Sequence, residues 1–308
     1  MKKYTTSVVL SAYNGEKYII EQMESLRKQT IPPDEVLVFD DRSTDSTLSL
    51  VQEYIRKHDL HNWKLQVNEQ NKGWRQNFVD GISEADGDLI FPCDQDDIWL
   101  PNKLEETIKV MQNTKINVLV SYLYLYFENG TCKLYPGKAD KSVSKVAVTK
   151  NFMNIVFPGC VYCIRKEFSV MCNKYWKPSI PHDALYWRLA MFDGSLYCYH
   201  EPLIRWRKHS DSTFTVAAHK ARSIENKKKE LEYIDDVIEG LEEFFEDYHL
   251  SDKEKSSLLR DAKKWLFYRN RLLLNRQYFA ALKLLRYVRY YPRLKRYLLD
   301  IYIVLFRK

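Results

Sequence analysis

The chain has 308 residues, 45% of them hydrophobic and 29% charged, a composition that is ordinary for a globular protein with a sizeable core. No apolar run reaches the roughly 18–20 residues that span a bilayer. The N-terminus lacks a signal-peptide pattern, so we expect a cytoplasmic protein. Cys160 and Cys163 form a single CxxC pair without a second pair to complete a zinc site, so we expect the six cysteines to be reduced.

The net charge of +7 is distributed unevenly along the chain. Residues 262–308 carry thirteen Lys or Arg and one acid, Asp300, a net charge of +12, which leaves −5 for the first 261 residues. This asymmetry indicates two functional regions, an acidic body that bears a site and a basic C-terminal part.

The first hundred residues alternate short apolar strands with helical patterns. We expect strands at 7–12, 36–39, 63–67 and 88–91, with helices at 16–28, 44–57 and 74–83 between them. Continuous apolar strands separated by helices are typical of a parallel sheet covered on both faces. Ligands bind such sheets beyond the carboxyl ends of the strands.

Three polar clusters follow three of these strands, at 13–16, 40–45 and 94–97, and we expect them to line one rim. The last places three carboxylates in four positions, whose repulsion raises their pKa values unless a cation or hydrogen bonds offset it. Such hard oxygen ligands suit Mg²⁺ or Mn²⁺, and an ion of this kind usually binds substrate phosphates as well. The alternative is a solvated turn that carries a helix cap.

The middle of the chain is mixed. Asn129-Gly130 predicts a hairpin between strands at 118–127 and 132–135, followed by a polar loop over 137–150. Helical patterns then occur near Phe152, Lys166 and Ala184, and strands near Gly159 and Leu196. From about residue 219 onward the pattern is helical to the end.

The chain contains neither a P-loop nor a GxGxxG motif, so side chains at the strand ends would have to hold a nucleotide. Asp40 or Asp41 could accept hydrogen bonds from a base N–H. The alternative is a turn in which Ser43 or Thr44 caps the next helix. Both roles can coexist, and we expect one carboxylate to be structural and the other to contact the ligand.

Four ordered motifs resemble those of the inverting family 2 glycosyltransferases, in particular the bacterial rhamnosyltransferase branch of surface-polysaccharide synthesis. They are Ser11-Ala12-Tyr13-Asn14-Gly15-Glu16, Asp40 to Asp45, Asn71-Lys72-Gly73 with Asn77-Phe78, and Asp94 to Asp97. The resemblance covers roughly residues 5–215. It implies an α/β GT-A fold, Rossmann-like with a mostly parallel central sheet and helices on both faces. It also implies a dTDP- or UDP-sugar donor and a divalent metal, Mg²⁺ or Mn²⁺.

The resemblance implies a division of the chain. Residues 1–215 would form the catalytic domain, with a nucleotide-binding half over 1–112 and an acceptor-binding half over 113–215. Residues 216–308 would form a C-terminal, helical and basic amphipathic region.

Individual residues also receive roles from the resemblance. Asp40 and Asp41 would contact the nucleobase and its sugar, and Asp94 the ribose or deoxyribose. Asp96 would hold the metal, and Asp97 would support the sugar or the groups around the metal. The other donor-binding residues would be Ser11, Tyr13, Asn14, Glu16, Asn71, Gly73, Asn77 and Gln95.

Three further positions bear on the diphosphate. Arg207 and His209 match the family's Arg-x-His segment and would contact the leaving diphosphate or, for His209, the metal. Arg42 stands where the family usually has Gly. Its guanidinium reaches either a donor phosphate or a neighbouring acid.

Inversion at a sugar carbon requires a general base that deprotonates the attacking hydroxyl. Asp183 comes before a helical run at 184–191 and matches the family's acidic position, so we assign it as the base. The alternatives are that Asp183 caps that helix, or that His182, with a free pKa of about 6.5, takes the proton.

In the basic end from Trp265, Lys and Arg alternate with aromatic residues and leucines at helical spacing, as is typical of amphipathic helices at membrane surfaces. The alternatives are a hairpin packed on the catalytic body, or a nucleic-acid surface, which the high apolar share disfavours. We expect peripheral association with the inner face of the cell membrane and no nucleic-acid partner.

The sequence thus predicts a metal-dependent inverting glycosyltransferase. It would move a sugar, with rhamnose as one candidate, from a dTDP- or UDP-donor to a hydroxyl of a surface polysaccharide or a polyprenyl-linked glycan. One rival is a sugar-nucleotide-forming nucleotidyltransferase, which should have a Gly- and Lys/Arg-rich N-terminal loop that residues 11–15 lack. The other is a non-catalytic scaffold of the same fold.

Overall fold

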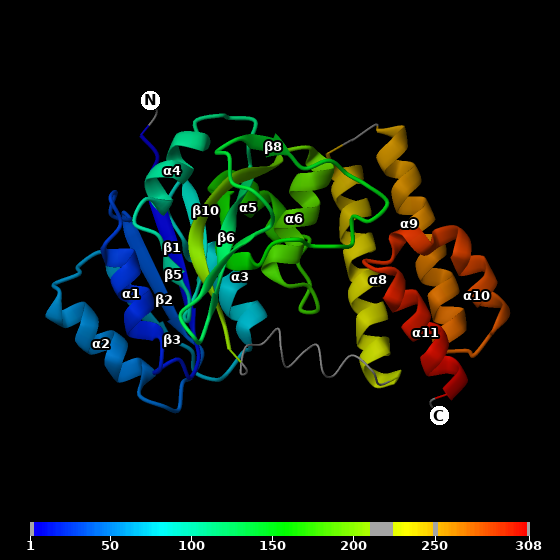
Figure 1. Cartoon of the computed structure of the whole chain (residues 1–308), viewed down its shortest axis with the longest axis horizontal. Helices are drawn as coiled ribbons and strands as arrows, with labels where there is room; N and C mark the ends of the chain where they lie inside the picture. The colour runs from blue at the N-terminus through cyan, green and yellow to red at the C-terminus, as the bar shows by residue number, and fades with distance from the viewer. Residues whose placement is uncertain (1–2, 210–223, 249–251, 307–308) are drawn as a thin grey trace. The chain divides into compact units, whose positions relative to one another are not determined.

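The computed structural model describes residues 3–209, 224–248 and 252–306 (Figure 1). The chain divides into two compact units, each assembled from separate stretches of sequence. The first consists of Met1–Val146, Phe157–Lys174 and Asp193–His209, and the second of Ala147–Val156, Tyr175–Phe192 and Ser210–Lys308. The predicted boundary at 215 lies outside the described residues, and the division into two halves at 112 stays a prediction.

A ten-stranded mixed sheet forms the centre of the first unit, in the order β3-β2-β1-β4-β9-β6-β10-β5, with β7 beside β6 and β8 beside β10. The strands are β1 (Thr6–Ala12), β2 (Glu35–Asp40), β3 (Trp63–Val67), β4 (Leu89–Asp94), β5 (Ile98–Trp99), β6 (Val118–Phe127), β7 (Cys132–Tyr135), β8 (Val143–Lys145), β9 (Tyr162–Arg165) and β10 (Leu196–Lys208). The run from β3 to β4 is parallel, as is the pair of β6 and β10, whereas β5, β7, β8 and β9 are antiparallel to their neighbours.

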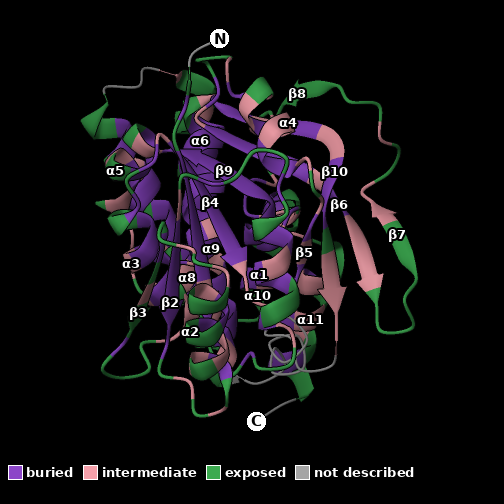
Figure 2. Cartoon of the chain, turned by 90° about the vertical axis from the view of Figure 1, so that its left-hand side faces the viewer, coloured by how far each residue is buried: buried purple, intermediate pink, exposed green. Residues whose placement is uncertain are grey.

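The continuous apolar strands β1, β2 and β4 are buried along almost their whole length, which is why they show no polar alternation (Figure 2). The helices of this unit are α1 (Ile19–Arg27), α2 (Thr47–Lys57), α3 (Trp74–Glu84), α4 (Lys103–Val110) and α5 (Lys166–Asn173). Helix α3 packs on β1 and β2 at Gly81, where an added Cβ would lie 2.5 Å from Cγ1 of Val9 and 3.0 Å from the Phe39 ring.

The second unit is helical, with α6 (His182–Asp193), α8 (Ile224–Asp247), α9 (Lys253–Leu273), α10 (Phe279–Leu284), the 3-10 helix η2 (Leu285–Tyr290) and α11 (Leu294–Phe306). α6 extends one residue past the second unit. None of the described helices combines the length and the apolarity needed to cross a membrane. The predicted α/β sheet with helices, followed by a C-terminal helical region, is confirmed. The sheet is mixed rather than mostly parallel, since four of its strand pairs are parallel and five are antiparallel.

A buried ion cluster joins three helices of the second unit. Asp300 on α11 is fully buried and pairs with Arg269 Nε of α9 at 2.8 Å and with Lys227 Nζ of α8 at 2.9 Å. Arg269 also pairs through Nη2 with Glu230 of α8 at 2.9 Å. The single acid of the basic end is therefore an internal counter-ion for two cations.

Two local predictions are wrong, and one predicted strand starts later than expected. Residues 150–153 form turns rather than a helix, and Phe152 is buried because its ring packs edge-on against Phe192, 5.1 Å between centroids. The strand expected near Gly159 is present as β9, which starts at Tyr162 after a 3-10 turn, η1 (Gly159–Val161). The polar loop over 137–150 contains the short strand β8, which pairs with β10.

Candidate active site

The three polar clusters meet at one edge of the sheet in the first unit. Ala12 at the end of β1 pairs in register with Asp40 at the end of β2, and Ser11 pairs with Asp94 at the end of β4. The carboxyl ends of these parallel strands therefore bring residues 13–16, 40–45 and 94–97 together. The prediction of a shared rim is confirmed.

The loop after β1 is fastened to the loop after β2. Asn14 donates its N–H to Ser43 Oγ at 3.0 Å and accepts the N–H of Thr44 on Oδ1 at 2.8 Å. Asn14 has a φ of 48°, a left-handed conformation that Asn tolerates better than most residues. The prediction that Ser43 or Thr44 caps the next helix is wrong, because both bind other loop residues and α2 begins at Thr47.

Glu16 extends the same attachment. Its N–H donates to Asp45 Oδ2 at 3.1 Å, and its Oε2 accepts the N–H of Ser46 at 2.9 Å. The oxygens of Asn14 and Glu16 thus hold the rim together. A contact of either residue with a donor stays a prediction.

Gln95 connects the end of β4 to the loop after β1. Its Oε1 accepts the N–H of Tyr13 at 2.8 Å, and its Nε2 donates to the carbonyl of Tyr13 at 3.0 Å. Gly15 allows this approach, since a Cβ there would lie 2.2 Å from Gln95 Oε1. Both main-chain groups of Tyr13 are fixed while its side chain remains 46% exposed, so the ring is accessible to a ligand.

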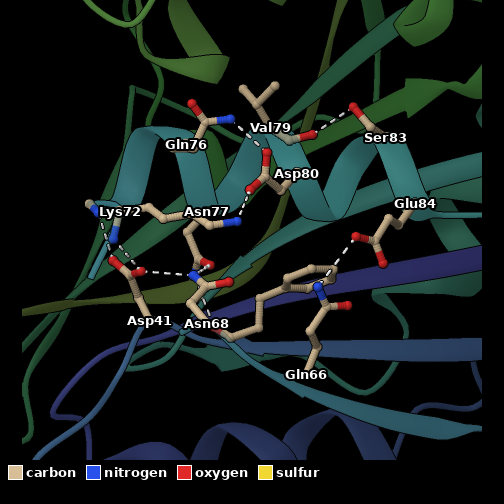
Figure 3. Close-up of polar contacts among 12 residues, drawn as sticks. Asp41, Gln66, Asn68, Lys72, Gln76, Asn77, Val79, Asp80, Ser83 and Glu84 are labelled. Atoms are coloured by element: carbon tan, nitrogen blue, oxygen red, sulfur yellow. Dashed lines mark hydrogen bonds and ion pairs between the residues drawn. The ribbon is translucent and has the colours of Figure 1, made fainter. Parts of the chain in front are cut away.

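Asp41 organises the loop before α3 (Figure 3). Its buried carboxylate accepts three hydrogen bonds of 2.8 Å, from the N–H of Lys72, the N–H of Gly73 and Nδ2 of Asn68. Its carbonyl accepts a further bond from Asn71 Nδ2 at 3.0 Å. Gly73 has a φ of 83°, which favours glycine there. Asp41 therefore has a structural role in this loop.

Asp40 is also buried, and its carboxylate accepts hydrogen bonds from the N–H and the hydroxyl of Ser43, at 2.9 and 2.5 Å. Below it, Asn77 donates to Ser11 Oγ at 2.7 Å and to the carbonyl of Phe39 at 2.9 Å. The predicted donor-binding residues Ser11, Asn71, Gly73 and Asn77 are thus linked by one hydrogen-bond network that runs through Asn68 and Asp41. Whether Asp40 contacts a nucleobase stays a prediction.

Sequence reasoning missed Asn68. Its buried side chain bridges the carboxylate of Asp41 and Oδ1 of Asn77, at 2.8 and 2.9 Å. The available signal was an Asn directly after the strand that ends at Val67, three residues before the Asn-Lys-Gly motif.

Arg42 adopts a φ of 67°, the left-handed conformation that the family's usual glycine would take without strain. Its Nη1 donates to the main-chain carbonyl of Glu69 at 2.9 Å. The guanidinium therefore binds a backbone oxygen of a neighbouring acid rather than a carboxylate.

The acidic turn after β4 is tied to the end of β10. Asp96 Oδ2 and His209 Nε2 lie 2.8 Å apart, so the two predicted metal ligands are in direct contact. Arg207 donates its main-chain N–H to Asp97 Oδ1 at 2.9 Å and its Nε to the carbonyl of Asp96 at 2.8 Å. The predicted partners of the metal and the diphosphate therefore form one cluster.

The Arg207 side chain is held from three sides. Its Nη2 pairs with the carboxylate of Glu21 on α1. Its guanidinium lies over the rings of Tyr18 and Tyr126, at 4.5 and 5.0 Å from their centroids. This enclosure fixes a cation beside the acidic turn.

Asp97 is the electrostatic centre of the turn. Burial, reinforced by repulsion from Asp96 and Asp94, raises its pKa well above the usual range. Its Oδ2 is buried and has no hydrogen-bond partner within the described parts of the chain. Asp97, Asp94 and Cys160 each place a ligand atom within 4.8 Å of the others. An orphaned buried oxygen among carboxylates fits a divalent cation, and Cys160 is a neighbour that the sequence did not indicate.

Asp183 and His182 begin helix α6 in the second unit, whereas the rim belongs to the first. Asp183 is half-buried, and its Oδ1 accepts the N–H of Ala184 at 2.7 Å, a local contact at the helix start. His182 is 3% exposed, and burial lowers its pKa to about 3, so it is neutral at pH 7. The burial of His182 and its weak basicity argue against it as the alternative base, while the role of Asp183 stays a prediction.

Comparison with known proteins identifies the class. The family described as Glycosyl transferase family 2 matches residues 7–166, just over half of the chain. The chain therefore belongs to family 2 of the glycosyltransferases and is an enzyme of that class, as predicted.

Two relatives illustrate the range of this similarity. The chain is 29% identical to the dTDP-rhamnosyl transferase RfbG of Shigella flexneri, over 66% of this chain and 72% of the relative. It is 35% identical to the UDP-Glc:alpha-D-GlcNAc-diphosphoundecaprenol beta-1,3-glucosyltransferase WfgD of Escherichia coli, over 42% of this chain and 47% of the relative.

Solved structures confirm the GT-A fold. S. aureus TarS 1-349 in complex with UDP-GlcNAc matches with a TM-score of 0.57 and 19% identity, over 97% of this chain and 91% of that one. GalNAc-T7 with UDP, GalNAc and Mn²⁺ matches with a TM-score of 0.56 and 17% identity, over 80% of this chain and 55% of that one. At these identities the similarity establishes the fold alone.

Proposed function

We propose that this glycosyltransferase moves a sugar from a dTDP- or UDP-linked donor to a hydroxyl of a surface polysaccharide or a lipid-linked glycan, with inversion at the transferred carbon. The observation that carries the proposal is the rim of the first unit, where three strand ends converge on an acidic turn with one unsatisfied carboxylate oxygen. The names of the relatives support it. RfbG is named for a dTDP-rhamnosyl donor, and WfgD for a diphosphoundecaprenol-linked acceptor.

The proposed cofactor is Mg²⁺ or Mn²⁺. Asp96 and His209 would hold it, with Asp94 and Asp97 beside them, and the bound ion would neutralise charge on the donor diphosphate. The Mn²⁺ in the GalNAc-T7 structure is consistent with such a site on this fold. Arg207 would stabilise the diphosphate as it leaves, since its guanidinium is already fixed at the turn.

The nucleoside would lie along the rest of the rim. The exposed ring of Tyr13 offers a surface for the base, and Asp40 would accept from a base N–H. Asp41, Asn71, Gly73 and Asn77 would act mainly by keeping the loop under the base in place, because their polar groups already bind one another or the main chain.

In the proposed reaction the carboxylate of Asp183 takes the proton of the acceptor hydroxyl. The hydroxyl oxygen attacks the anomeric carbon, and the bond from that carbon to the diphosphate oxygen breaks with its electron pair. The configuration inverts because attack and departure occur on opposite faces of the carbon. We further propose that the acceptor is lipid-linked and that the enzyme works at the inner face of the membrane.

The central test is the thermal stability of the protein with a panel of nucleotide sugars, in Mn²⁺ and in EDTA. We expect one donor to raise the melting temperature in Mn²⁺ only. Asp96→Asn should abolish that shift, whereas Asp183→Asn should keep the shift and remove transfer. Asp59→Asn, at an acid whose side chain is 82% exposed, is the matched control.

Two outcomes would contradict the proposal. If no donor stabilises the protein in Mn²⁺, the rim does not bind a nucleotide sugar. If Asp183→Asn turns over at the wild-type rate, the base is another group.

A further inference from the structure

Large apolar side chains are unusually exposed at the C-terminal end of the second unit. Phe279 is 84% exposed, Phe306 71% and Leu282 66%. The other apolar side chains of α10, η2 and α11 that are at least half exposed are Tyr278, which precedes α10, Leu285, Leu294, Leu298, Tyr302 and Leu305. A surface helix of a globular protein normally turns polar residues outward, so an exposed apolar surface of this kind indicates an interaction site.

Helix α11 has two apolar faces. Its buried face, which includes Tyr297, Ile303 and Val304, packs within the unit. Its exposed residues Leu294, Leu298, Tyr302 and Leu305 recur every three or four positions, which places them in one stripe along the helix. Helix formation does not require this second apolar stripe, since Lys or Glu on a solvated face would favour the helix equally well.

The exposed stripes lie on adjacent helices. The hydroxyl of Tyr297 on α11 donates to the carbonyl of Ala281 on α10 at 3.0 Å, and both helices also pack on α9 (Figure 1). In α10 and η2 the exposed Phe279, Leu282 and Leu285 again follow a three-residue spacing.

The charges on this surface are all of one sign. Exposed cations stand among the apolar residues at Lys283, Arg286, Arg289, Arg293 and Lys295, and none of these five has an ion pair within the described residues. The only acid of residues 262–308, Asp300, is buried against Lys227 and Arg269. No exposed acid of this segment offsets its positive potential.

We infer that the exposed surface of α10, η2 and α11 docks on a bilayer that contains anionic lipids. The apolar side chains would enter the interface between head groups and acyl chains, and the five cations would meet lipid phosphates. A second copy fits less well, because two identical surfaces would bring like charges together. The inference names the surface for the proposed membrane association, and it does not depend on sugar transfer.

The test is co-sedimentation of the full chain with vesicles of phosphatidylcholine alone or mixed with phosphatidylglycerol. We expect binding to the mixed vesicles that is much stronger than to phosphatidylcholine and that weakens with added salt. Arg286→Gln and Arg289→Gln should each lower the binding constant roughly fivefold. Phe279→Asp should lower it about tenfold or more, because it removes a side chain that would be buried in the interface.

The matched control is Val170→Asp, which places the same acid at a 62% exposed apolar position on α5 of the first unit and should leave vesicle binding unchanged. Circular dichroism checks that each variant keeps its helices. Absence of binding to mixed vesicles, or equal loss with Val170→Asp, would overturn the inference.

Self-association would also overturn it, if Phe279→Asp converted a dimer to a monomer in size-exclusion chromatography without changing vesicle binding. The donor-induced thermal shift, measured on Phe279→Asp, keeps the two proposals separate. A normal donor-induced shift in Phe279→Asp, together with lost vesicle binding, supports the docking surface. Absence of a donor-induced shift in the wild-type protein would concern the donor site alone.

Discussion

Arg42 occupies a left-handed backbone position in the loop that holds the candidate nucleotide site, with a φ of 67°. A residue with a Cβ is destabilised there by about 1–2 kcal/mol relative to glycine. The hydrogen bond to the Glu69 carbonyl and the stiffer unfolded chain of a non-glycine residue offset part of this.

From this balance we expect Arg42→Gly to change the free energy of unfolding by less than about 1 kcal/mol, whereas Arg42→Val should lower it by about 1–2 kcal/mol, because a β-branched residue fits this φ poorly. Urea denaturation of the two variants is the measurement. Equal stability of both would show that the backbone at this position is not strained.

His182 gives the second unit a pH dependence with a definite sign. Burial lowers its pKa from 6.5 to about 3 in the folded chain, so the unfolded chain binds the proton more tightly. The contribution of the neutral, buried His182 to folding stability is complete above pH 6.5. It is lost as the pH falls towards 3, at up to about 1.4 kcal/mol for each pH unit.

We therefore expect His182→Phe to reduce the pH dependence of the free energy of unfolding between pH 6 and 4 by about the contribution of one titrating proton. Urea denaturation of wild type and variant side by side is the measurement. The comparison isolates His182, because the carboxylates that also titrate in this range are common to both proteins. Parallel pH profiles would contradict a neutral, buried His182.

At the level of residues, the sequence was enough to predict which residues form the rim, but not the hydrogen bonds among them. The three clusters could be predicted to meet because the ends of parallel strands share an edge. The carboxylate of Asp41 accepts hydrogen bonds from Lys72, Gly73 and Asn68. These bonds depend on how a loop that is distant in sequence folds back. The proximity of Cys160 to Asp94 and Asp97 is likewise tertiary, since more than sixty positions separate them.

At the level of elements, the contact of α3 with the sheet depends on the absence of a side chain at Gly81. A Cβ there would lie 2.5 Å from Cγ1 of Val9 and 3.0 Å from the Phe39 ring, and both residues are buried in β1 and β2. The helix could move away only by uncovering the strands, one of which ends at Asp40.

We expect Gly81→Ala to lower the free energy of unfolding by about 1–3 kcal/mol through overpacking, despite the higher helix propensity of Ala. Glu84→Ala, at an exposed position of the same helix, is the control and should remain within about 0.5 kcal/mol of wild type. Chemical denaturation of both variants is the measurement, and a stabilised Gly81→Ala would mean that α3 can shift without loss.

Strong periodicity predicted most helices and strands of the first hundred residues, and boundaries were the main error. α2 starts at Thr47 rather than near residue 44, because Ser43 and Thr44 bond to the rim instead of capping it. The helix expected near Phe152 is absent because its apolar residues serve tertiary packing against α6. Sequence patterns indicate which residues are buried, but they do not indicate whether those residues lie in a helix, a strand or a turn.

At the level of the whole molecule, Asp300 and Glu230 together balance the buried cations of the second unit. Asp300 faces both Lys227 and Arg269, so its removal would leave buried cations with a reduced set of partners. Loss of one member of a buried ion pair costs about 3–5 kcal/mol.

We expect Asp300→Asn to lower the free energy of unfolding by an amount of this order, and to speed hydrogen exchange in α8, α9 and α11 more than in β1, β2 and β4. Glu225→Gln, which breaks an exposed pair with Lys229 on α8, should cause no measurable change. Uniform acceleration of exchange along the chain would contradict a cluster that acts within its own unit.

The first compact unit is threaded from three stretches, and the last of them ends at His209, whose ring touches Asp96. A chimera that transplants residues 1–146 alone would lack β9 and β10, and with them Arg207 and His209. Its carboxylates would arrive without the guanidinium and imidazole that accompany them in the native chain. Exchanging sugar specificity between relatives by a crossover near residue 146 should therefore fail, and successful swaps should carry the segment up to residue 209.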